Sequence, residues 1–318
     1  MSKLKHQIQR IIYRIFRRIK RHYLTHPVRP DTRLYFFSVD IADKVMSPRI
    51  KVDPVVKSVW KQLYFLRYGN QPLFKVDTNK AVARDSHDHQ WPRGTLVDNS
   101  TNPRFNLKLY DYFDNRNDLC VLDLGCSGGG FVRSFLEDGY TAIGLEGSDA
   151  SKKLRSAEWE TCRHHLFTTD ITAPFSITDD KGKALSFHCI TQWEVLEHIP
   201  EDKLDVLFNN IKRHLADDGI FVGSVDMAPD GNPITGAVYH VTLKSESWWL
   251  ARFAKAGLVP VSNHPFNTLD YVRGHGMGLK DWDPADLDGF HFVIKKSLSG
   301  DFMNQASDKT NVGSFCEN

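Results

Sequence analysis

A glycine-rich turn between two apolar runs most constrains the fold of this 318-residue chain. Val121–Gly130 reads VLDLGCSGGG, and Ala142–Asp149 reads AIGLEGSD. The first run predicts a buried strand and a turn that opens a helix, and the second predicts a strand ending in an acidic residue. Glycine has no side chain and reaches positive φ, so a ligand can approach such a turn closely. A carboxylate at the end of the next strand suits a ribose diol, so the pattern favours a ligand containing adenosine.

The spacing of the glycines distinguishes two kinds of adenosine cofactor. A dinucleotide fingerprint requires glycine at its first, third and sixth positions, where a helix N-terminus receives a pyrophosphate. Counted from Gly125, the third position is Ser127. Asp123 precedes the turn, and its carboxylate would repel a pyrophosphate but attract the ammonium and sulfonium groups of S-adenosylmethionine. The spacing therefore favours S-adenosylmethionine over NAD.

The chain resembles the class I S-adenosylmethionine-dependent methyltransferase family over roughly residues 105–297. Asp123, Gly125 and Gly129 match the first motif of that family, roughly D/E-x-G-x-G-x-G, and Ser127 departs from it where glycine is more usual. Ile190–Pro200 reads ITQWEVLEHIP, which resembles the fourth strand and following loop of the many members with E-V-L-E-H-I-P. The resemblance depends on several motifs that occur in the right order.

The resemblance implies which residues hold the cofactor S-adenosylmethionine. The methionine part is expected at Asp123 and the glycine-rich turn, the ribose at Glu146, and the adenine at Asp170 with Ile171. The alternatives are that the glycines serve only close helix–strand packing, and that the two acids are solvated loop residues. The expected cofactor-binding residues are Asp123, Gly125, Ser127, Gly129, Glu146, Asp170, Ile171 and Gln192.

Two histidines are the candidates for handling the methyl acceptor. Methyl transfer is an in-line displacement at an activated carbon, and an alcohol acceptor also benefits from a base that takes its proton. Histidine has a reference pKa of about 6.5, so it suits that role. His198 follows the expected fourth strand, and His240 follows the loop after the fifth. The alternative is that either ring only fixes a loop through backbone hydrogen bonds, and Glu194 and Glu197 are expected to be structural.

No metal site is expected. The five cysteines have no C-x-x-C spacing and are expected to be reduced structural thiols. Asp85–Gly94 reads DSHDHQWPRG and is expected to be a polar loop. Its H-x-H pair with two aspartates is only a weak metal signal. The aromatic residues around it could form a lid or stack on a sugar, although ordinary packing is the simpler interpretation.

The first 30 residues carry nine Lys or Arg and no acidic residue, which leaves the remainder with 32 basic and 39 acidic residues. The apolar positions of this arm recur at three- and four-residue steps, so it is expected to be a cationic amphipathic helix. Such a helix can lie on an anionic membrane surface, dock on a protein, or bind nucleic acid. The mildly acidic remainder does not favour broad nucleic-acid binding. No apolar run is long enough for a transmembrane helix, and a cytoplasmic protein, peripheral on the inner membrane face through its arm, is expected.

Strand and helix patterns alternate from Asn106, which predicts a parallel sheet with helices on both faces. The resemblance implies an α/β, doubly wound, mostly parallel seven-stranded Rossmann-like sheet whose last strand is antiparallel, with an N-terminal helical extension. The expected divisions are the arm at 1–30, an extension at 31–104 that serves as a lid or acceptor-binding region, the methyltransferase domain at 105–297, and a disordered tail at 298–318. Strands are expected near 120–124, 141–146, 164–168, 186–191, 219–225, 258–262 and 290–295, and helices over Glu201–Leu215 and Ser245–Ala256.

The expected function is S-adenosylmethionine-dependent methylation, most simply O-methylation of a small molecule or of a sugar in a surface glycan or lipid-linked intermediate. The sugar preference is a hypothesis based on the membrane-seeking arm and the aromatic-rich, acidic body. Three alternatives remain: a nucleic-acid or protein methyltransferase, a non-enzymatic cofactor-binding protein of the same fold, and a membrane-docking adaptor. The chain shows no N-P-P-Y-like amino-methylating motif.

Overall fold

The computed structural model describes residues 61–62, 64–65, 67–69, 73–267, 270 and 289–297. The expectations for the arm at 1–30, for the tail at 298–318 and for residues 31–60 of the extension lie outside the described residues. Within the described ranges, no helix has the length and apolar character that a membrane crossing requires.

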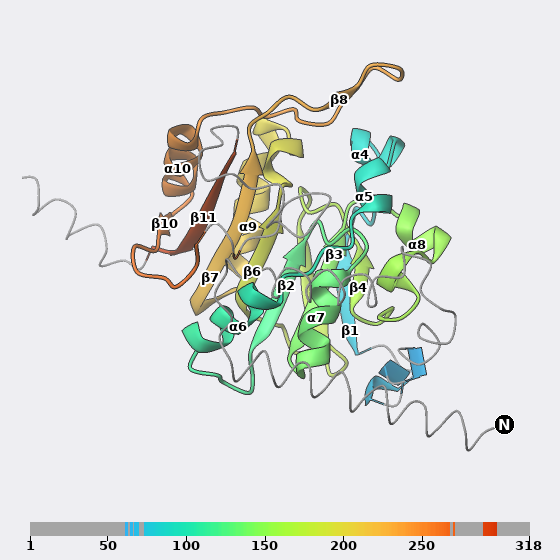
Figure 1. The fold of residues 1–318 in the computed structure, drawn as a ribbon, viewed down its shortest axis with the longest axis vertical. Helices are drawn as coiled ribbons and strands as arrows, with labels where there is room; N and C mark the ends of the chain where they lie inside the picture. The colour runs from blue at the N-terminus through green and yellow to red at the C-terminus, as the bar shows by residue number, and fades with distance from the viewer. Residues whose placement is uncertain are drawn as a thin grey trace, which may run out of the picture.

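Seven strands form the central sheet, in the order β10-β11-β7-β6-β2-β3-β4 (Figure 1). Strands β4, β3, β2, β6 and β7 pair in parallel, whereas β11 is antiparallel to both of its neighbours. This sheet confirms the expected fold class, including the antiparallel last strand. The strands are β2 (Cys120–Leu124), β3 (Thr141–Glu146), β4 (Leu166–Thr168), β6 (Phe187–Trp193), β7 (Leu215–Asp226), β10 (Leu258–Pro260) and β11 (Gly289–Lys296).

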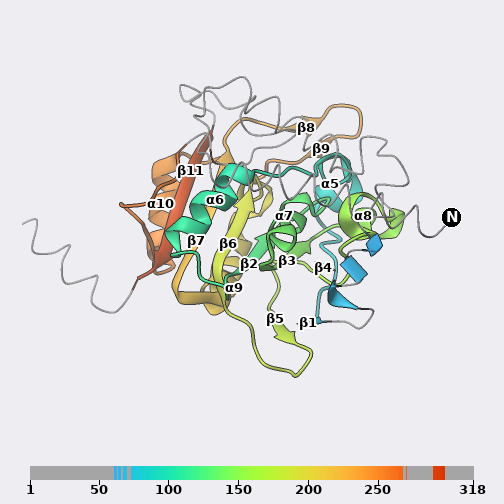
Figure 2. The same cartoon turned by 60° about the horizontal axis from the view of Figure 1, so that its bottom comes forward.

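Helices cover both faces of the sheet and bury two hydrophobic clusters against it (Figures 1 and 2). Helices α6 (Pro103–Tyr112) and α7 (Gly130–Asp138) pack on one face, and α9 (Leu204–His214) and α10 (Glu246–Lys255) pack on the other. The four apolar residues of α9 that face the sheet are each at most 1% exposed, and burying such a side chain stabilises the fold by about 1.5–3 kcal/mol. These residues are Leu204, Leu207, Phe208 and Ile211.

Local sequence explains where two of these helices begin. Asn102 caps α6, because its side chain accepts from the backbone N–H groups of Arg104 and Phe105, and a proline occupies the first helical position. Helix α7 begins after Gly129, whose φ of +87° is left-handed, and ends at Gly139, which is also left-handed. The glycine-rich turn therefore leads directly into the helix, as the sequence predicts.

Several short elements were not expected from the sequence. Strands β1 (Phe74–Thr78) and β5 (Phe175–Asp179) form a separate antiparallel pair, and β8 (Gly231–Asn232) pairs with β9 (Ala237–Val238) in a protruding hairpin (Figure 1). The expectation that Asp85–Gly94 is a loop is wrong in part. Helix α4 (His87–Gln90) lies within it, capped by the Ser86 side chain, and α5 (Arg93–Val97) begins there. A side-chain cap nucleates a helix that the polar composition does not suggest.

The chain before α6 crosses the carboxyl edge of the sheet. Backbone hydrogen bonds join the N–H of Ala83 to the carbonyl of Gly147 at 2.9 Å, and the N–H of Asp170 to the carbonyl of Lys80 at 2.9 Å. Further along, the N–H of Gly128 donates to the carbonyl of Asp98 at 3.0 Å. Residues 79–102, called the covering segment below, therefore lie against the ends of β2, β3 and β4.

Candidate active site

The glycines of the turn after β2 are required by both backbone conformation and close contact. Gly125 has a φ of +78°, and a Cβ there would lie 2.5 Å from Val195 Cγ2. A Cβ on Gly129 would lie 2.6 Å from Leu166 Cδ1. A side chain at either position would force its neighbour to shift and would strain the left-handed backbone, so glycine is strongly favoured at both. The contact at Gly129 supports the alternative that this glycine serves close helix–strand packing. The contact at Gly125 shows that the loop after β6 lies against the turn.

Glu146 is not a solvated loop acid. One of its carboxylate oxygens accepts from the backbone N–H of Ser127 at 2.8 Å, and the other accepts from the N–H of Ser148 at 2.9 Å and from the Thr95 hydroxyl at 3.4 Å. Its side chain is buried, and this burial raises its pKa. Ser127 itself has a φ of +48°. The carboxylate therefore fixes the shape of the turn at the one position where the sequence departs from the family motif.

The covering segment contacts the same turn. The Ser127 hydroxyl lies 3.0 Å from the carbonyl of Thr95 and 2.8 Å from that of Asp98, and the Asn99 amide donates to the buried Glu158 at 3.1 Å. Sequence reasoning missed these contacts because no motif identifies residues 95–99. The nearest signal was the expectation that the extension acts as a lid or acceptor-binding region.

Asp123 lies inside β2 and is 3% exposed. Its carboxyl oxygen accepts from the Thr191 hydroxyl at 2.7 Å. Burial raises the pKa of Asp123 to about 7, and the negative charges of Asp98 and Glu146 act in the same direction. A positively charged ligand would favour the ionised form of this group, because opposite charges stabilise each other in a poorly solvated site.

Asp170 lies after β4, in the wall of a cavity of about 310 Å³ that the covering segment completes. One oxygen of its carboxylate accepts from the backbone N–H and the hydroxyl of Thr172, at 2.9 and 2.6 Å, and the other lies 3.9 Å from the Lys80 ammonium. Ile171 is buried in the core, and its carbonyl accepts from the Asn210 amide at 3.0 Å. The proposed adenine contacts of Asp170 and Ile171 stay predictions.

Gln192 is fully buried near the end of β6, and within the described part of the chain neither its amide oxygen nor its amide nitrogen has a hydrogen-bond partner. Buried polar groups are nearly always paired, so an unpaired amide at the sheet edge suits a residue that contacts a ligand. Trp193, which follows it, packs edge-on against Phe105 and Phe131, with ring centroids 5.2 and 5.5 Å apart.

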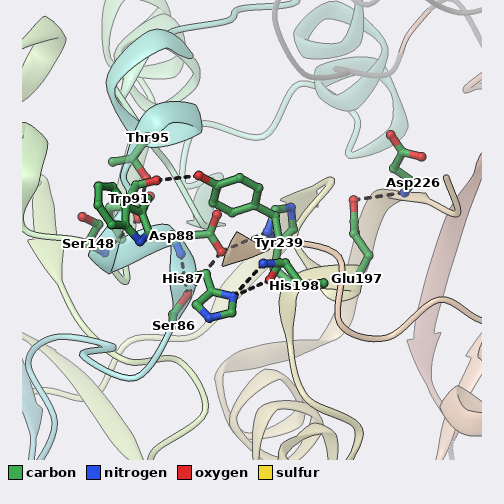
Figure 3. Close-up of polar contacts among 12 residues, drawn as sticks. Ser86, His87, Asp88, Trp91, Thr95, Ser148, Glu197, His198, Asp226 and Tyr239 are labelled. Carbon is green, nitrogen blue, oxygen red and sulfur yellow. Dashed lines mark hydrogen bonds and ion pairs between the residues drawn. The ribbon is translucent and has the colours of Figure 1, made fainter. Parts of the chain in front are cut away.

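The structure brings the two candidate histidines together beyond the ends of β6 and β7. The ring centroids of His198 and His240 are 4.8 Å apart. His198 Nδ1 lies 2.9 Å from a carboxylate oxygen of Asp88 in α4 (Figure 3), and His240 Nδ1 lies 2.5 Å from the carbonyl of Ala228. Glu197 joins them, because one ligand atom from each of Glu197, His198 and His240 lies within 4.8 Å of the others. Sequence reasoning placed Glu197 in a structural role only.

The charges around His198 and Glu197 shift both pKa values. Burial acts to lower the pKa of His198, but the hydrogen bond and charge of Asp88 outweigh it and raise that pKa to about 9. Burial raises the pKa of Glu197 to about 8. In this state His198 keeps its proton at neutral pH, so it does not act as a base until that proton is displaced.

The first histidine of the H-x-H pair in α4 contacts the backbone of another part of the chain. His87 Nδ1 lies 2.6 Å from the carbonyl of Val238, and the Tyr239 hydroxyl donates to the carbonyl of Trp91 at 3.3 Å (Figure 3). These contacts join α4 to the β8–β9 hairpin. Through Asp88, the covering segment therefore reaches the histidine pair as well as the glycine-rich turn.

A family model described as a methyltransferase domain matches residues 99–268 of this chain. The match covers more than half of the chain and begins in the covering segment. The chain belongs to this methyltransferase family, which confirms the resemblance to class I S-adenosylmethionine-dependent methyltransferases. The family membership also supports S-adenosylmethionine as the cofactor.

Solved structures similar to this one are also methyltransferases. The glycopeptide N-methyltransferase MtfA, complexed with S-adenosylmethionine, is 14% identical, with 63% of this chain and 96% of that chain covered and a TM-score of 0.40. An S-adenosylmethionine-dependent methyltransferase from Clostridium acetobutylicum is 13% identical over 66% and 96%, with a TM-score of 0.44. A TehB-like S-adenosylmethionine-dependent methyltransferase from Corynebacterium glutamicum is 16% identical over 68% and 98%, with a TM-score of 0.41. No curated protein sequence matches the chain.

Proposed function

We propose that this methyltransferase transfers the methyl group of S-adenosylmethionine to an oxygen of a small molecule or of a glycan sugar. The observation that carries the proposal is the pairing of His198 and His240, whose rings lie 4.8 Å apart. They follow β6 and β7, on the side of the glycine-rich turn where the Val195 side chain meets Gly125. An acceptor hydroxyl between the histidines and the turn would lie beside the methyl donor.

The chain's residues divide the work between donor and acceptor. Glu146 and the turn that it braces are proposed to hold the ribose and methionine parts, and Asp123 supplies negative charge to the cationic donor. The unpaired Gln192 amide is proposed to contact the cofactor between them. Transfer needs an acceptor oxygen aligned within about 3–3.5 Å of the methyl carbon, with water excluded. His240 is proposed to orient the acceptor or to take its proton, and His198 to assist.

The covering segment is proposed to exclude water from the reaction. It lies on the turn through Asp98 and on the histidine pair through Asp88. A segment with both contacts can respond to donor and acceptor together, because each ligand would touch one of its ends. This extends the expectation that the region before the methyltransferase domain serves as a lid or contributes to acceptor binding.

An acceptor panel tests the proposal. The full chain is incubated with S-adenosylmethionine and nucleotide sugars, glycolipids, phenols, peptides or RNA, and release of S-adenosylhomocysteine is measured. Turnover with sugars or small hydroxyl compounds is expected, and turnover of peptide or RNA alone would overturn the proposal. Turnover of phenols alone would exclude a glycan sugar as the acceptor.

Variants separate donor binding from acceptor chemistry. His240→Ala should lose turnover while keeping its affinity for S-adenosylhomocysteine. His164→Ala is the matched control, since His164 lies at the amino end of β4, at the opposite edge of the sheet. Binding of cofactor without release of product on any acceptor would instead indicate a non-enzymatic binding protein. Deleting residues 1–30 should leave turnover of a soluble acceptor intact and remove binding to anionic liposomes.

A further inference from the structure

Glu197, His198 and His240 have the composition and spacing of a metal-binding group. One oxygen or nitrogen from each lies within 4.8 Å of the others. Glu197 is fully buried, and its Oε1 accepts from the backbone N–H of Asp226 at 3.1 Å (Figure 3). Its Oε2 is buried and has no hydrogen-bond partner among the described residues. A buried carboxylate oxygen without a partner is costly, and a bound cation would satisfy it.

Both histidine rings are held in the way that metal ligands usually are. A ligating histidine generally uses one ring nitrogen for the metal and hydrogen-bonds the other to a carboxylate or a carbonyl. His198 Nδ1 lies 2.9 Å from the Asp88 carboxylate, and His240 Nδ1 lies 2.5 Å from the carbonyl of Ala228. Each ring therefore keeps Nε2 for a ligand. The two hydrogen-bonding partners of these rings lie in separate parts of the chain, α4 and the loop after β7.

We propose that Glu197, His198 and His240 bind one divalent transition-metal cation, of the Zn²⁺, Co²⁺ or Mn²⁺ kind, which receives the acceptor oxygen. Two imidazoles and one carboxylate suit these ions, whereas Mg²⁺ and Ca²⁺ prefer oxygen ligands throughout. Three protein ligands also leave a coordination position for a water or a substrate, as in catalytic zinc sites. The proposal deepens the methyltransferase function and rests on it for the identity of the oxygen.

A cation at this site would let the histidine pair bind and activate the acceptor oxygen. An acceptor hydroxyl bound to the cation loses its proton to solvent more readily, because the metal withdraws charge from the O–H bond. The oxygen then forms a bond to the methyl carbon as the carbon–sulfur bond breaks, and the electron pair of that bond stays on sulfur. The products are the methyl ether, S-adenosylhomocysteine and one proton.

Metal binding can be measured without donor or acceptor. The full chain is stripped with a chelator, dialysed against Zn²⁺ or Mg²⁺, and the bound metal is counted per chain by elemental analysis. The titration is repeated with Co²⁺, whose visible absorption reports its ligands. One equivalent of Zn²⁺ and of Co²⁺ is expected, with no comparable binding of Mg²⁺.

Variants assign the metal to the site. Glu197→Gln and His240→Ala should no longer bind the metal, or should bind it at least about 100-fold more weakly. Asp88→Asn should weaken metal binding about 10–100-fold, because Asp88 positions His198. His164→Ala should bind as the native chain does. Glu197→Gln preserves side-chain shape, so it keeps the test informative if His240→Ala fails to fold.

The outcomes separate this proposal from the proposed function. The metal site is overturned if the native chain binds no equivalent of metal. It is also overturned if folded Glu197→Gln and His240→Ala chains bind the metal as the native chain does. Turnover that persists after chelation overturns its role while leaving the methyltransferase function standing. One assigned equivalent in a chain that turns over no acceptor upholds the metal site and overturns the proposed reaction instead.

Discussion

Replacing Asp123 with asparagine tests the state of the buried carboxyl group beside the glycine-rich turn. Burial raises its pKa to about 7 in the folded chain, whereas an unfolded aspartate titrates near about 3.9. The folded state therefore holds the proton more tightly than the unfolded state. The stability that this group contributes is fully present below pH of about 4 and is lost as the pH rises through about 7.

The size of the effect follows from the difference between the two pKa values. Each pKa unit corresponds to about 1.4 kcal/mol, so ionising this carboxyl group should lower the free energy of unfolding by about 2–3 kcal/mol between pH 5 and pH 8. Asparagine cannot ionise there and keeps a similar shape. The Asp123→Asn chain should therefore gain about 2–3 kcal/mol relative to the native chain over the same interval.

Urea unfolding followed by tryptophan fluorescence measures this at pH 5 and pH 8 without ligand. Other titrating groups are present in both proteins, so their contributions cancel in the difference. Asp180→Asn is the control, because Asp180 is exposed in the turn after β5. Its difference from the native chain should change by less than about 0.5 kcal/mol. If the difference between Asp123→Asn and the native chain is also the same at pH 5 and pH 8, Asp123 does not have a raised pKa in the folded chain.

Three further substitutions probe the surroundings of the turn. Glu146→Gln removes one charged hydrogen-bond acceptor worth about 1.5–3 kcal/mol. Calorimetry should therefore find S-adenosylhomocysteine bound about 10–150-fold more weakly. The control Asp149→Asn, three residues away, should change that affinity less than about twofold. In thermal unfolding, Gly129→Ala should destabilise the chain more than Gly182→Ala does. Both glycines have positive φ, but only at Gly129 would the added Cβ lie as close as 2.6 Å to a neighbouring atom. Equal losses of stability in the two variants would exclude that contact as a cause. Glu158→Gln breaks a buried ion pair of 2.8 Å with an arginine of α7 and should cost about 3–5 kcal/mol in urea unfolding, and a loss below about 1 kcal/mol would contradict that.

The fold could be predicted from local sequence because its main elements carry strong local signals. Each of the seven expected strands overlaps a strand of the central sheet. The helix expected over Glu201–Leu215 corresponds to α9, whose apolar residues are buried against the sheet. The antiparallel last strand came from the resemblance, whereas the order of the strands in the sheet was not predicted, since no local pattern states which strands are neighbours.

The structure of the covering segment could not be predicted, because it depends on contacts with residues that are distant in the sequence. Helix α4 has only four residues and depends on the Ser86 cap and on His87 meeting the β8–β9 hairpin. Isolated helices of that length are not stable, so neither periodicity nor composition identifies one. Residues such as Thr95 contact the turn through single hydrogen bonds that leave no pattern in sequence.

The residues of the candidate site were chosen from the sequence one at a time, and their grouping was not expected. Glu146 and the turn were recognisable from a motif, and the structure joins them through the hydrogen bond from the backbone N–H of Ser127 to the Glu146 carboxylate. His198 and His240 were chosen separately, by their positions after expected strands. Their approach to each other and to Glu197 depends on the register of β6 and β7, which sets where both loops begin.

The central claim is that a cationic methyl donor binds over the glycine-rich turn between Asp123 and Glu146. Isothermal titration calorimetry of the full chain with S-adenosylhomocysteine and, separately, with NADH tests it most directly. One binding site for S-adenosylhomocysteine and no measurable heat from NADH are expected. Heat from NADH together with none from S-adenosylhomocysteine, in a chain that melts cooperatively, would contradict it.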